Sequence, residues 1–262
     1  MSVFQAAVLG IVQGLTEFLP VSSSGHLILV PRLLGWETQD LAFDAAIHLA
    51  TLAAILAALW TEVAQIVRGL ARWKTDPWGR LGWMIVVSTL PVLVIGFVFK
   101  DMIEVVFRSS HLVALSLGFW GILLFIADRL VSKGALSDVR LVGWKRALGI
   151  GATQALALLP GTSRSGVTIT AGLFSGLNRE TAATFSFLLG VPATAAAGAG
   201  AILDLATGQA YVEPLPLVAG FVTAFVSGFF AIRFLLKLMK GASYAWFAVY
   251  RISLAALILF LF

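Results

Sequence analysis

The sequence predicts an all-α, polytopic membrane protein, and three observations support that prediction. Of the 262 residues, 60% are hydrophobic and only 12% are charged, about half the charged share of an ordinary soluble domain. The mean hydropathy is +0.97. The apolar residues lie in long blocks, which is typical of helices that cross a bilayer. We therefore expect one integral membrane domain over residues 1–262.

Six apolar blocks predict spanning helices. They cover roughly 42–60, 84–99, 110–127, 182–203, 215–235 and 244–262. The block at 84–99 is short and contains Pro91 and Gly96, so the pattern does not fix its ends. Two further apolar stretches, about 2–35 and 147–177, are interrupted by Pro, Gly, Ser and charged residues. We expect re-entrant helix pairs there, because protein or a water-filled cavity must cover the freed backbone groups.

The charges of the connecting segments predict the orientation in the membrane. Three basic connections lie at 61–83, 128–146 and 233–243. Three neutral or acidic connections lie near 36–41, 100–109 and 204–214. Basic residues concentrate on the cytoplasmic side of membrane proteins, so the first set should face the cytoplasm and the second set should face outward. This placement also explains the formal net charge of +5 without a nucleic-acid partner.

Composition excludes further classes of site. The chain has no cysteine, which excludes disulfides, thiolate metal sites and a cysteine nucleophile. The first Lys or Arg is Arg32, so the basic start of a secretory signal peptide is missing and we expect none.

An internal repeat relates the two interrupted stretches. QGLTEFLPVSSSG (13–25) and QALALLPGTSRSG (154–166) align without a gap, and the same offset pairs Gly10 with Gly151 and Gly35 with Gly176. Three spanning blocks follow each copy, an odd number, so the second copy should enter from the opposite face. This predicts an inverted-topology repeat with copies at about 1–128 and 147–262, whose broken segments meet near the midplane.

The first interruption combines a helix break with polar side chains. Gln13 and Glu17 would share one helix face, and Pro20 disfavours helix at Leu19. The residues that begin the next half-helix are Ser22, Ser23, Ser24, Gly25 and His26. Free N–H groups and hydroxyls at a helix start favour binding of an anion such as phosphate.

The second interruption repeats this arrangement and adds a guanidinium group. The break at Pro160-Gly161 is followed by Thr162, Ser163, Arg164, Ser165 and Gly166, with Thr168 one turn further on. Arginine binds phosphate oxygens bidentately and keeps its charge when buried. We place Ser163, Ser165, Gly166 and Thr168 with the substrate-binding residues.

The combined residues are those that binding and hydrolysis of a diphosphate require. Two half-helix starts and Arg164 would bind the anion, while Glu17 and His26 would hold a divalent cation or transfer protons. Each residue also has a structural alternative, since buried Glu, His and Arg pair with one another and Ser often bonds to a helix carbonyl. For His48, a structural pair with Asp44 and a place in the lining of the site remain equal alternatives.

QGLTEFLPVSSSGHL and LLPGTSRSG resemble the two signature stretches of bacterial undecaprenyl-pyrophosphate phosphatases, the integral membrane type associated with bacitracin resistance. The resemblance covers essentially the whole chain in length, block order and motif spacing. It implies dephosphorylation of undecaprenyl diphosphate, which recycles the lipid carrier of cell-wall synthesis. It also implies a divalent cation, Mg²⁺ or Ca²⁺, and a multi-pass protein of the inner (plasma) membrane with an active site facing the periplasm.

The resemblance also implies roles for particular residues. The acidic motif of the family corresponds to Gln13 and Glu17, and its phosphate-binding arginine corresponds to Arg164. Its serine-histidine stretch corresponds to Ser22, Ser23 and His26. Many members carry a second glutamate where this chain has Gln13, so Glu17 would ligate the cation alone, with diphosphate and water completing the shell.

The sequence leaves several alternatives open. The attacking group is Ser23, His26 or a cation-bound water. The competing function is a transporter or flippase for an anionic lipid, because inverted repeats with broken helices are also transporter architecture. A structural membrane protein is a more distant alternative, since it would not need Glu, His and Arg in matched breaks. The sequence does not decide between a monomer and a homodimer.

Overall fold

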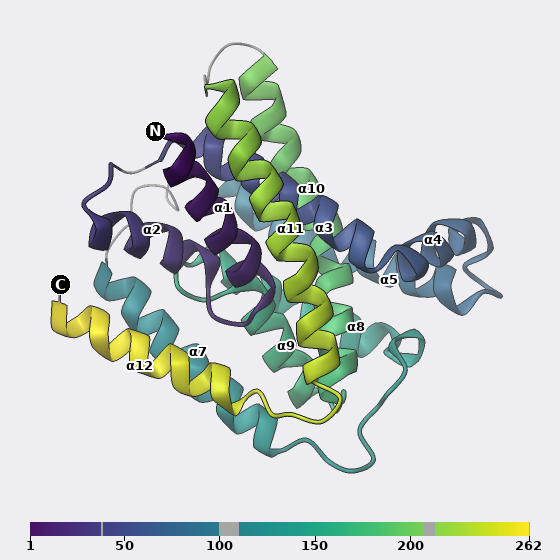
Figure 1. Ribbon diagram of the computed structural model, residues 1–262. Helices are drawn as coiled ribbons and strands as arrows, with labels where there is room; N and C mark the ends of the chain where they lie inside the picture. Colours follow the sequence, from purple (N-terminus) through teal and green to yellow (C-terminus); the bar gives the residue numbers. More distant parts are fainter. Residues whose placement is uncertain (38, 100–109, 207–212, 262) are drawn as a thin grey trace.

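The architecture is a bundle of helices, seen in a computed structural model that describes residues 1–37, 39–99, 110–206 and 213–261 (Figure 1). The first half contains α1 (Val3–Phe18), α2 (Ser23–Leu34), α3 (Leu41–Ala58), α4 (Trp60–Gly69), η1 (Leu70–Arg72), α5 (Pro77–Val98) and α7 (Ser110–Arg129). The second half contains η2 (Val139–Leu141), α8 (Gly143–Gln154), η3 (Ala155–Leu158), α9 (Arg164–Phe174), α10 (Arg179–Ala206), α11 (Pro214–Leu238) and α12 (Ala245–Leu261). The described residues contain no β-strand, as an all-α protein requires.

Four helices of the described residues, α5, α7, α10 and α11, are long and apolar enough to cross a membrane. This confirms the prediction of a multi-pass membrane protein. Helix α5 begins at Pro77, earlier than the predicted 84, because Asp76 accepts the N–H of Trp78 and Pro77 has the fixed φ of a first helical residue. Pro91 lies inside this helix and does not end it.

Two of the six predicted spans differ from the structure. The block 42–60 is not one straight helix, since α3 and α4 meet at Leu59 with a bend of 82°. The connection predicted at 61–83 is therefore largely helical. Helix α12 is apolar but has only 17 residues, which is at the lower end of spanning lengths, about 17–25 residues.

Other connections are shorter than the sequence predicts. Helix α11 continues to Leu238, into the predicted basic connection 233–243, and α8 already begins at Gly143. The predicted outer connection 100–109 lies outside the described residues, and so does most of the one at 204–214.

The helices pack in matched pairs. Helix α1 lies against α11, and α8 lies against α5, while α3 packs on α10 and α7 on α12 (Figure 1). A Cβ atom at Gly10 would lie 2.3 Å from the carbonyl oxygen of Gly220, and one at Gly151 would lie 2.1 Å from that of Ser88. The two glycines that the repeat pairs are thus both points of close backbone contact. These matched contacts support an internal repeat, and its boundaries at about 1–128 and 147–262 remain a prediction.

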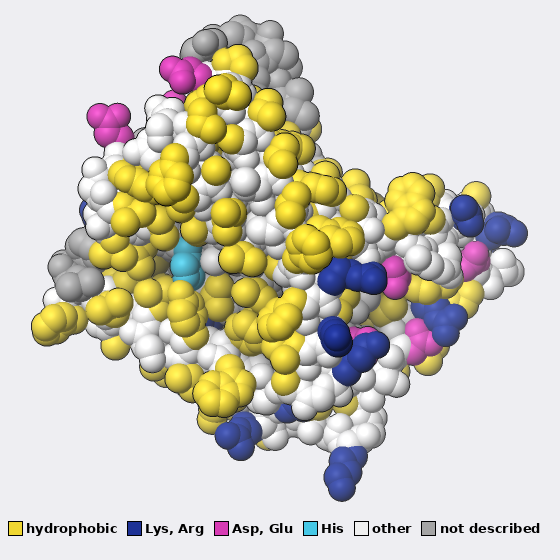
Figure 2. All heavy atoms as spheres, in the orientation of Figure 1, with side chains coloured by type: hydrophobic (Ala, Val, Ile, Leu, Met, Phe, Trp, Pro, Cys, Tyr) yellow, Lys and Arg dark blue, Asp and Glu magenta, His cyan; other side chains and the backbone are white. Residues whose placement is uncertain are grey.

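The polarity of the molecule is reversed relative to a soluble domain. Large apolar side chains such as Phe97, Phe230 and Trp246 are more than 60% exposed, whereas Gln13, Glu17 and other polar residues are buried. Hydrophobic side chains cover the face in Figure 2, with Lys and Arg gathered along its lower and right edges. Apolar surface outside and polar groups inside is the arrangement that a lipid solvent selects.

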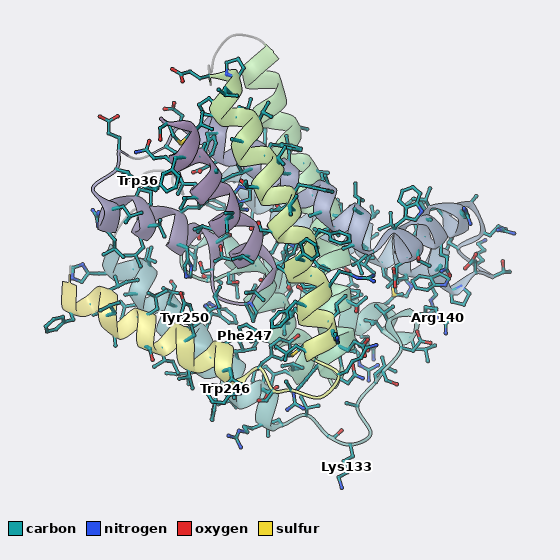
Figure 3. All side chains as sticks on the ribbon, viewed as in Figure 1. Trp36, Lys133, Arg140, Trp246, Phe247 and Tyr250 are labelled. Carbon is teal, nitrogen blue, oxygen red and sulfur yellow. The ribbon has the colours of Figure 1, made fainter. Side chains whose placement is uncertain are left out.

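A buried ion pair that the sequence analysis did not single out ties three segments together. The Asp128 carboxylate at the end of α7 accepts hydrogen bonds from Arg179 Nε at 2.5 Å, from the Tyr244 N–H at 3.1 Å and from the Ser243 hydroxyl. It therefore joins α7 to the start of α10 and to the connection before α12. Lys133 and Arg140 lie between α7 and α8, at the bottom and at the right of the view in Figure 3.

Candidate active site

The two helix breaks have the same backbone course. Helix α1 ends at Phe18, and Leu19 is extended at φ −65° and ψ 138° immediately before Pro20. In the second copy, η3 ends at Leu158, and Leu159 is extended at φ −75° and ψ 123° before Pro160. Proline excludes the helical conformation from the preceding residue in both cases. The predicted breaks are confirmed at the predicted residues.

Each half-helix that follows a break begins at a serine in an unusual conformation. Ser22 and Ser163 are the described non-glycine residues with positive φ, at 76° and 70°. Each hydroxyl accepts the N–H three residues later, from Gly25 at 3.4 Å and from Gly166 at 3.1 Å. Such strained backbone concentrates at functional sites. The two serines therefore shape the starts of α2 and α9.

The serine hydroxyls of each break also contact one another. The Oγ atoms of Ser22 and Ser24 lie 3.3 Å apart, and those of Ser163 and Ser165 lie 3.2 Å apart. The Ser165 hydroxyl also donates to the Leu19 carbonyl at 3.3 Å. This bond joins the second break directly to the first. Ser23 differs from the others because its hydroxyl bonds to a carboxylate.

Glu17 is the point at which both breaks meet. Its Oε1 accepts a hydrogen bond from Arg164 Nη2 at 2.6 Å. Its Oε2 accepts from Ser23 Oγ at 2.8 Å and from Gln13 Nε2 at 3.1 Å. The carboxylate is buried, with 7% of the residue exposed. The structure thus brings together Gln13, Glu17, Ser23 and Arg164 as the sequence predicted.

Arg164 keeps one donor group without a partner. Its Nη1 is buried and makes no hydrogen bond. The guanidinium lies against Gly190 of α10, where a Cβ atom would be 1.7 Å from Nη1. The Thr168 hydroxyl contacts the Arg164 carbonyl at 2.8 Å and Ser186 Oγ at 2.6 Å. Thr168 therefore supports the first turn of α9. The Nη1 group of Arg164, which has no partner, could donate to an anion.

His26 lies in the first turn of α2, as predicted, and its ring contacts α12. Its Nδ1 lies 2.7 Å from the Ser22 carbonyl oxygen, so Nδ1 carries the hydrogen and Nε2 is the acceptor. Nε2 accepts from the Tyr250 hydroxyl at 2.6 Å, and the two rings stack at 5.8 Å. Tyr250 belongs to α12 (Figure 3). Both ring nitrogens are thus occupied, and Ser23 bonds to Glu17 instead of His26.

The sequence analysis did not single out Arg251, which holds both breaks. It is fully buried, and its guanidinium donates to the carbonyls of Pro20 at 3.1 Å and Thr162 at 2.8 Å. Further bonds reach Gly161 and Leu117. An arginine inside the apolar block 244–262 was the available signal, because charges within such blocks mark functional or pairing positions. Tyr250 and Gly190 carry no comparable signal.

The donor atoms at the site suit a cation that takes few protein ligands. Among the described residues, no three His, Cys, Asp or Glu side chains converge. Beside the Glu17 carboxylate, however, Gln13 Oε1 is buried and makes no hydrogen bond. One carboxylate and one amide oxygen fit Mg²⁺, which usually completes its shell with waters and substrate phosphates.

Comparisons with a family model and with individual proteins match nearly the whole chain. The family model described as "Bacitracin resistance protein BacA" matches residues 6–257. An undecaprenyl-diphosphatase of Moorella thermoacetica is 46% identical over 264 residues, which cover 100% of this chain and 98% of the relative. Undecaprenyl-diphosphatase 1 of Pseudoalteromonas translucida is 42% identical, with 100% and 99% covered. The chain therefore belongs to the family of the bacitracin resistance protein BacA.

Proposed function

We propose that this protein is an integral membrane phosphatase that hydrolyses undecaprenyl diphosphate to undecaprenyl phosphate and inorganic phosphate. The observation that carries the proposal is the Glu17 carboxylate, which Ser23 contacts from the first break and Arg164 from the second. The names of the full-length relatives support this choice of substrate.

Binding of the diphosphate falls to Arg164 and the two half-helix starts. The unpartnered Nη1 donors of Arg164 would bind phosphate oxygens. The first N–H groups of α2 and α9 lack acceptors within their own helices and favour negative charge. Both helix starts are fixed by their serine caps, so the donors need little reorganisation when charge builds up.

Ser23 is the nucleophile in this proposal, and Glu17 is its base. The Ser23 hydroxyl already donates to Glu17 at 2.8 Å, within the range that proton transfer requires. Ser23 Oγ would bond to the terminal phosphorus as its proton passes to Glu17, and the bond to the bridging oxygen would break. Undecaprenyl phosphate leaves. Water then attacks the phosphorus of the phosphoserine, the bond from phosphorus to Ser23 Oγ breaks, and Glu17 returns its proton to Ser23 Oγ as inorganic phosphate forms.

A divalent cation, Mg²⁺ or Ca²⁺, would be held by Glu17 and the unpartnered Gln13 Oε1. When bound, it would neutralise charge on the diphosphate. Arg164 and the helix N–H groups would still bind the diphosphate, and Glu17 would still deprotonate Ser23.

The proposed location is the inner membrane of a bacterium, with the active site open to the periplasm. The long apolar helices make the protein multi-pass. The basic residues of the connections between them would lie in the cytoplasm. At the periplasmic face, the reaction would return the lipid carrier to cell-wall synthesis.

A transporter of an anionic lipid is the weaker alternative. A carrier would use the Arg164 cation and the helix N–H groups. It would have no need of a serine hydroxyl bonded to a buried carboxylate. The contact between Ser23 and Glu17 therefore favours the hydrolase.

The test is release of phosphate from a polyprenyl diphosphate by the purified protein, with and without a chelator. We expect metal-dependent release that falls at least about a hundredfold in Glu17→Ala and Arg164→Ala, since each group acts on the transition state. Unchanged activity in both variants, or no release by the unsubstituted protein, would contradict the proposal. Near-normal turnover by Ser23→Ala would exclude the serine route.

A further inference from the structure

His48 projects from α3 toward Glu17. Its Nδ1 lies 2.7 Å from the carbonyl oxygen of Asp44, one turn earlier in the same helix. A carbonyl only accepts, so Nδ1 carries a hydrogen, and Nε2 is the ring nitrogen that could bind a metal ion. Metal-binding histidines usually have this arrangement, in which the other ring nitrogen donates to a carbonyl or carboxylate.

The second ring nitrogen of His48, Nε2, faces a carboxylate oxygen. The Nε2 atom lies 3.7 Å from Glu17 Oε2, too far for a hydrogen bond. At this distance the two atoms lie on either side of a position from which one cation could bind both.

The spacing and access suit a shared cation. Bonds of about 2.1 Å place neighbouring donors of one octahedral ion about 3 Å apart, so a side-chain shift of about 0.7 Å would bring Nε2 and Oε2 from 3.7 Å to that distance. The Gln13 amide donates Nε2 to the same Glu17 oxygen, and its Oε1 is buried without a partner. The His48 side chain is 35% exposed, so an ion can reach Nε2.

We propose that His48 is a nitrogen ligand of the divalent cation at Glu17, and that this ligand makes the site prefer Mn²⁺ over Ca²⁺. Ca²⁺ takes oxygen ligands, whereas Mn²⁺ belongs to the first-row transition ions, which as a series also accept nitrogen ligands, and is the weakest binder among them. Residue 13 is an amide and not a second carboxylate, so Glu17 is the charged ligand of the cation. His48 would add a nitrogen ligand to it. The inference rests on the proposed phosphatase only for the presence of a cation.

The direct test uses Mn²⁺ as the probe and electron spin echo envelope modulation (ESEEM) as the readout. Full-length protein in detergent is stripped with a chelator and loaded with Mn²⁺. Coupling of the bound Mn²⁺ to ¹⁴N should be present in the unsubstituted protein and absent in His48→Gln. His111→Gln is the matched control, since His111 is exposed at the start of α7, and it should keep the coupling.

Affinities give the second readout. We expect His48→Gln to raise the Mn²⁺ dissociation constant about tenfold. The Ca²⁺ dissociation constant, measured by competition, should change by less than about threefold, because Ca²⁺ gains little from nitrogen. Loss of ¹⁴N coupling with selective loss of Mn²⁺ affinity supports the ligand assignment.

Three results would overturn the assignment: no ¹⁴N coupling in the unsubstituted protein, coupling that persists in His48→Gln, or equal weakening of both ions. A failure of the proposed function is distinguishable from these. It would appear as no phosphate release with any metal, whatever the ¹⁴N spectrum shows.

Discussion

Glu17 and His26, both predicted as site residues, make different kinds of contact at the site. Its two oxygens accept from side chains of both halves of the chain, so it links the breaks as well as serving as a base. His26, by contrast, is bonded at both ring nitrogens and makes no bond to Ser23. The rotamer of His26 places its ring against Tyr250 of α12.

The hydroxyl of Tyr250 should matter for turnover. Tyr250→Phe keeps the stacked ring and removes the donor that bonds to His26 Nε2. Loss of one such hydrogen bond, worth about 1–1.5 kcal/mol, should lower kcat up to about tenfold with KM within about twofold, because the bond holds His26 in the first turn of α2, where the nucleophile Ser23 also lies. Steady-state phosphate release measures both constants. Equal kinetics for Tyr250→Phe and the unsubstituted protein would show that the hydroxyl has no part in the reaction.

At the scale of elements, the main feature is the pair of helix breaks, and hydrogen bonds from α12 join the two breaks. Arg251 bonds to backbone carbonyls on both sides, at Pro20 and at Gly161-Thr162. The break carbonyls would otherwise be buried without donors, which is costly in a membrane protein. Helix α12 thus contributes to the site through Tyr250 and Arg251, although it lies last in the chain.

Arg251→Lys should destabilise the fold. A lysine keeps the charge but cannot reach carbonyls of both breaks, and hydrogen bonds to charged groups are worth about 1.5–3 kcal/mol each. We expect a loss of about 2–4 kcal/mol of unfolding free energy, measured as a lower unfolding temperature in detergent. Arg233→Lys on the exposed face of α11 is the control and should change little. Equal stability of the two variants would argue against a role of Arg251 in holding the breaks.

The contact between α8 and α5 should tolerate no side chain at residue 151. A Cβ atom there would lie 2.1 Å from the Ser88 carbonyl oxygen, so Gly151→Ala should cost about 1–3 kcal/mol through forced separation of the helices. Gly149→Ala in the same helix is the matched control, because a Cβ atom there meets nothing within 4 Å. It should be neutral or slightly stabilising, since alanine favours helix. Thermal unfolding in detergent compares the two.

For the whole molecule, the segregation of charge predicts the orientation in the membrane. Glu37 and Glu213 are exposed near segments that should face outward, while Lys74 and Lys133 are exposed in basic connections. The chain has no cysteine, so single cysteines introduced at these positions report their side without background. A membrane-impermeant maleimide on intact cells should label positions 37 and 213 only. Labelling of positions 74 and 133 instead would reverse the orientation.

The sequence was informative where one local rule decides the backbone. Proline ended both helices at the preceding leucine, and Gln13 and Glu17 shared a helix face as their spacing required. It was less informative where packing decides. The bend at Leu59 contains neither Pro nor Gly. Helix α4 occupies a segment that the sequence analysis predicted as a connection because of its basic residues. Tyr250 lies 224 residues from its partner His26, a distance that no local pattern spans.

The central claim is that residues from both breaks act together on one diphosphate. Phosphate release by Ser23→Ala, Arg164→Ala and the double variant tests this directly. Groups that act as a unit have strongly non-additive effects, so we predict that each single substitution lowers kcat/KM at least about a hundredfold and that the double variant loses little more than the worse single one. Losses that simply multiply in the double variant would contradict a single shared site.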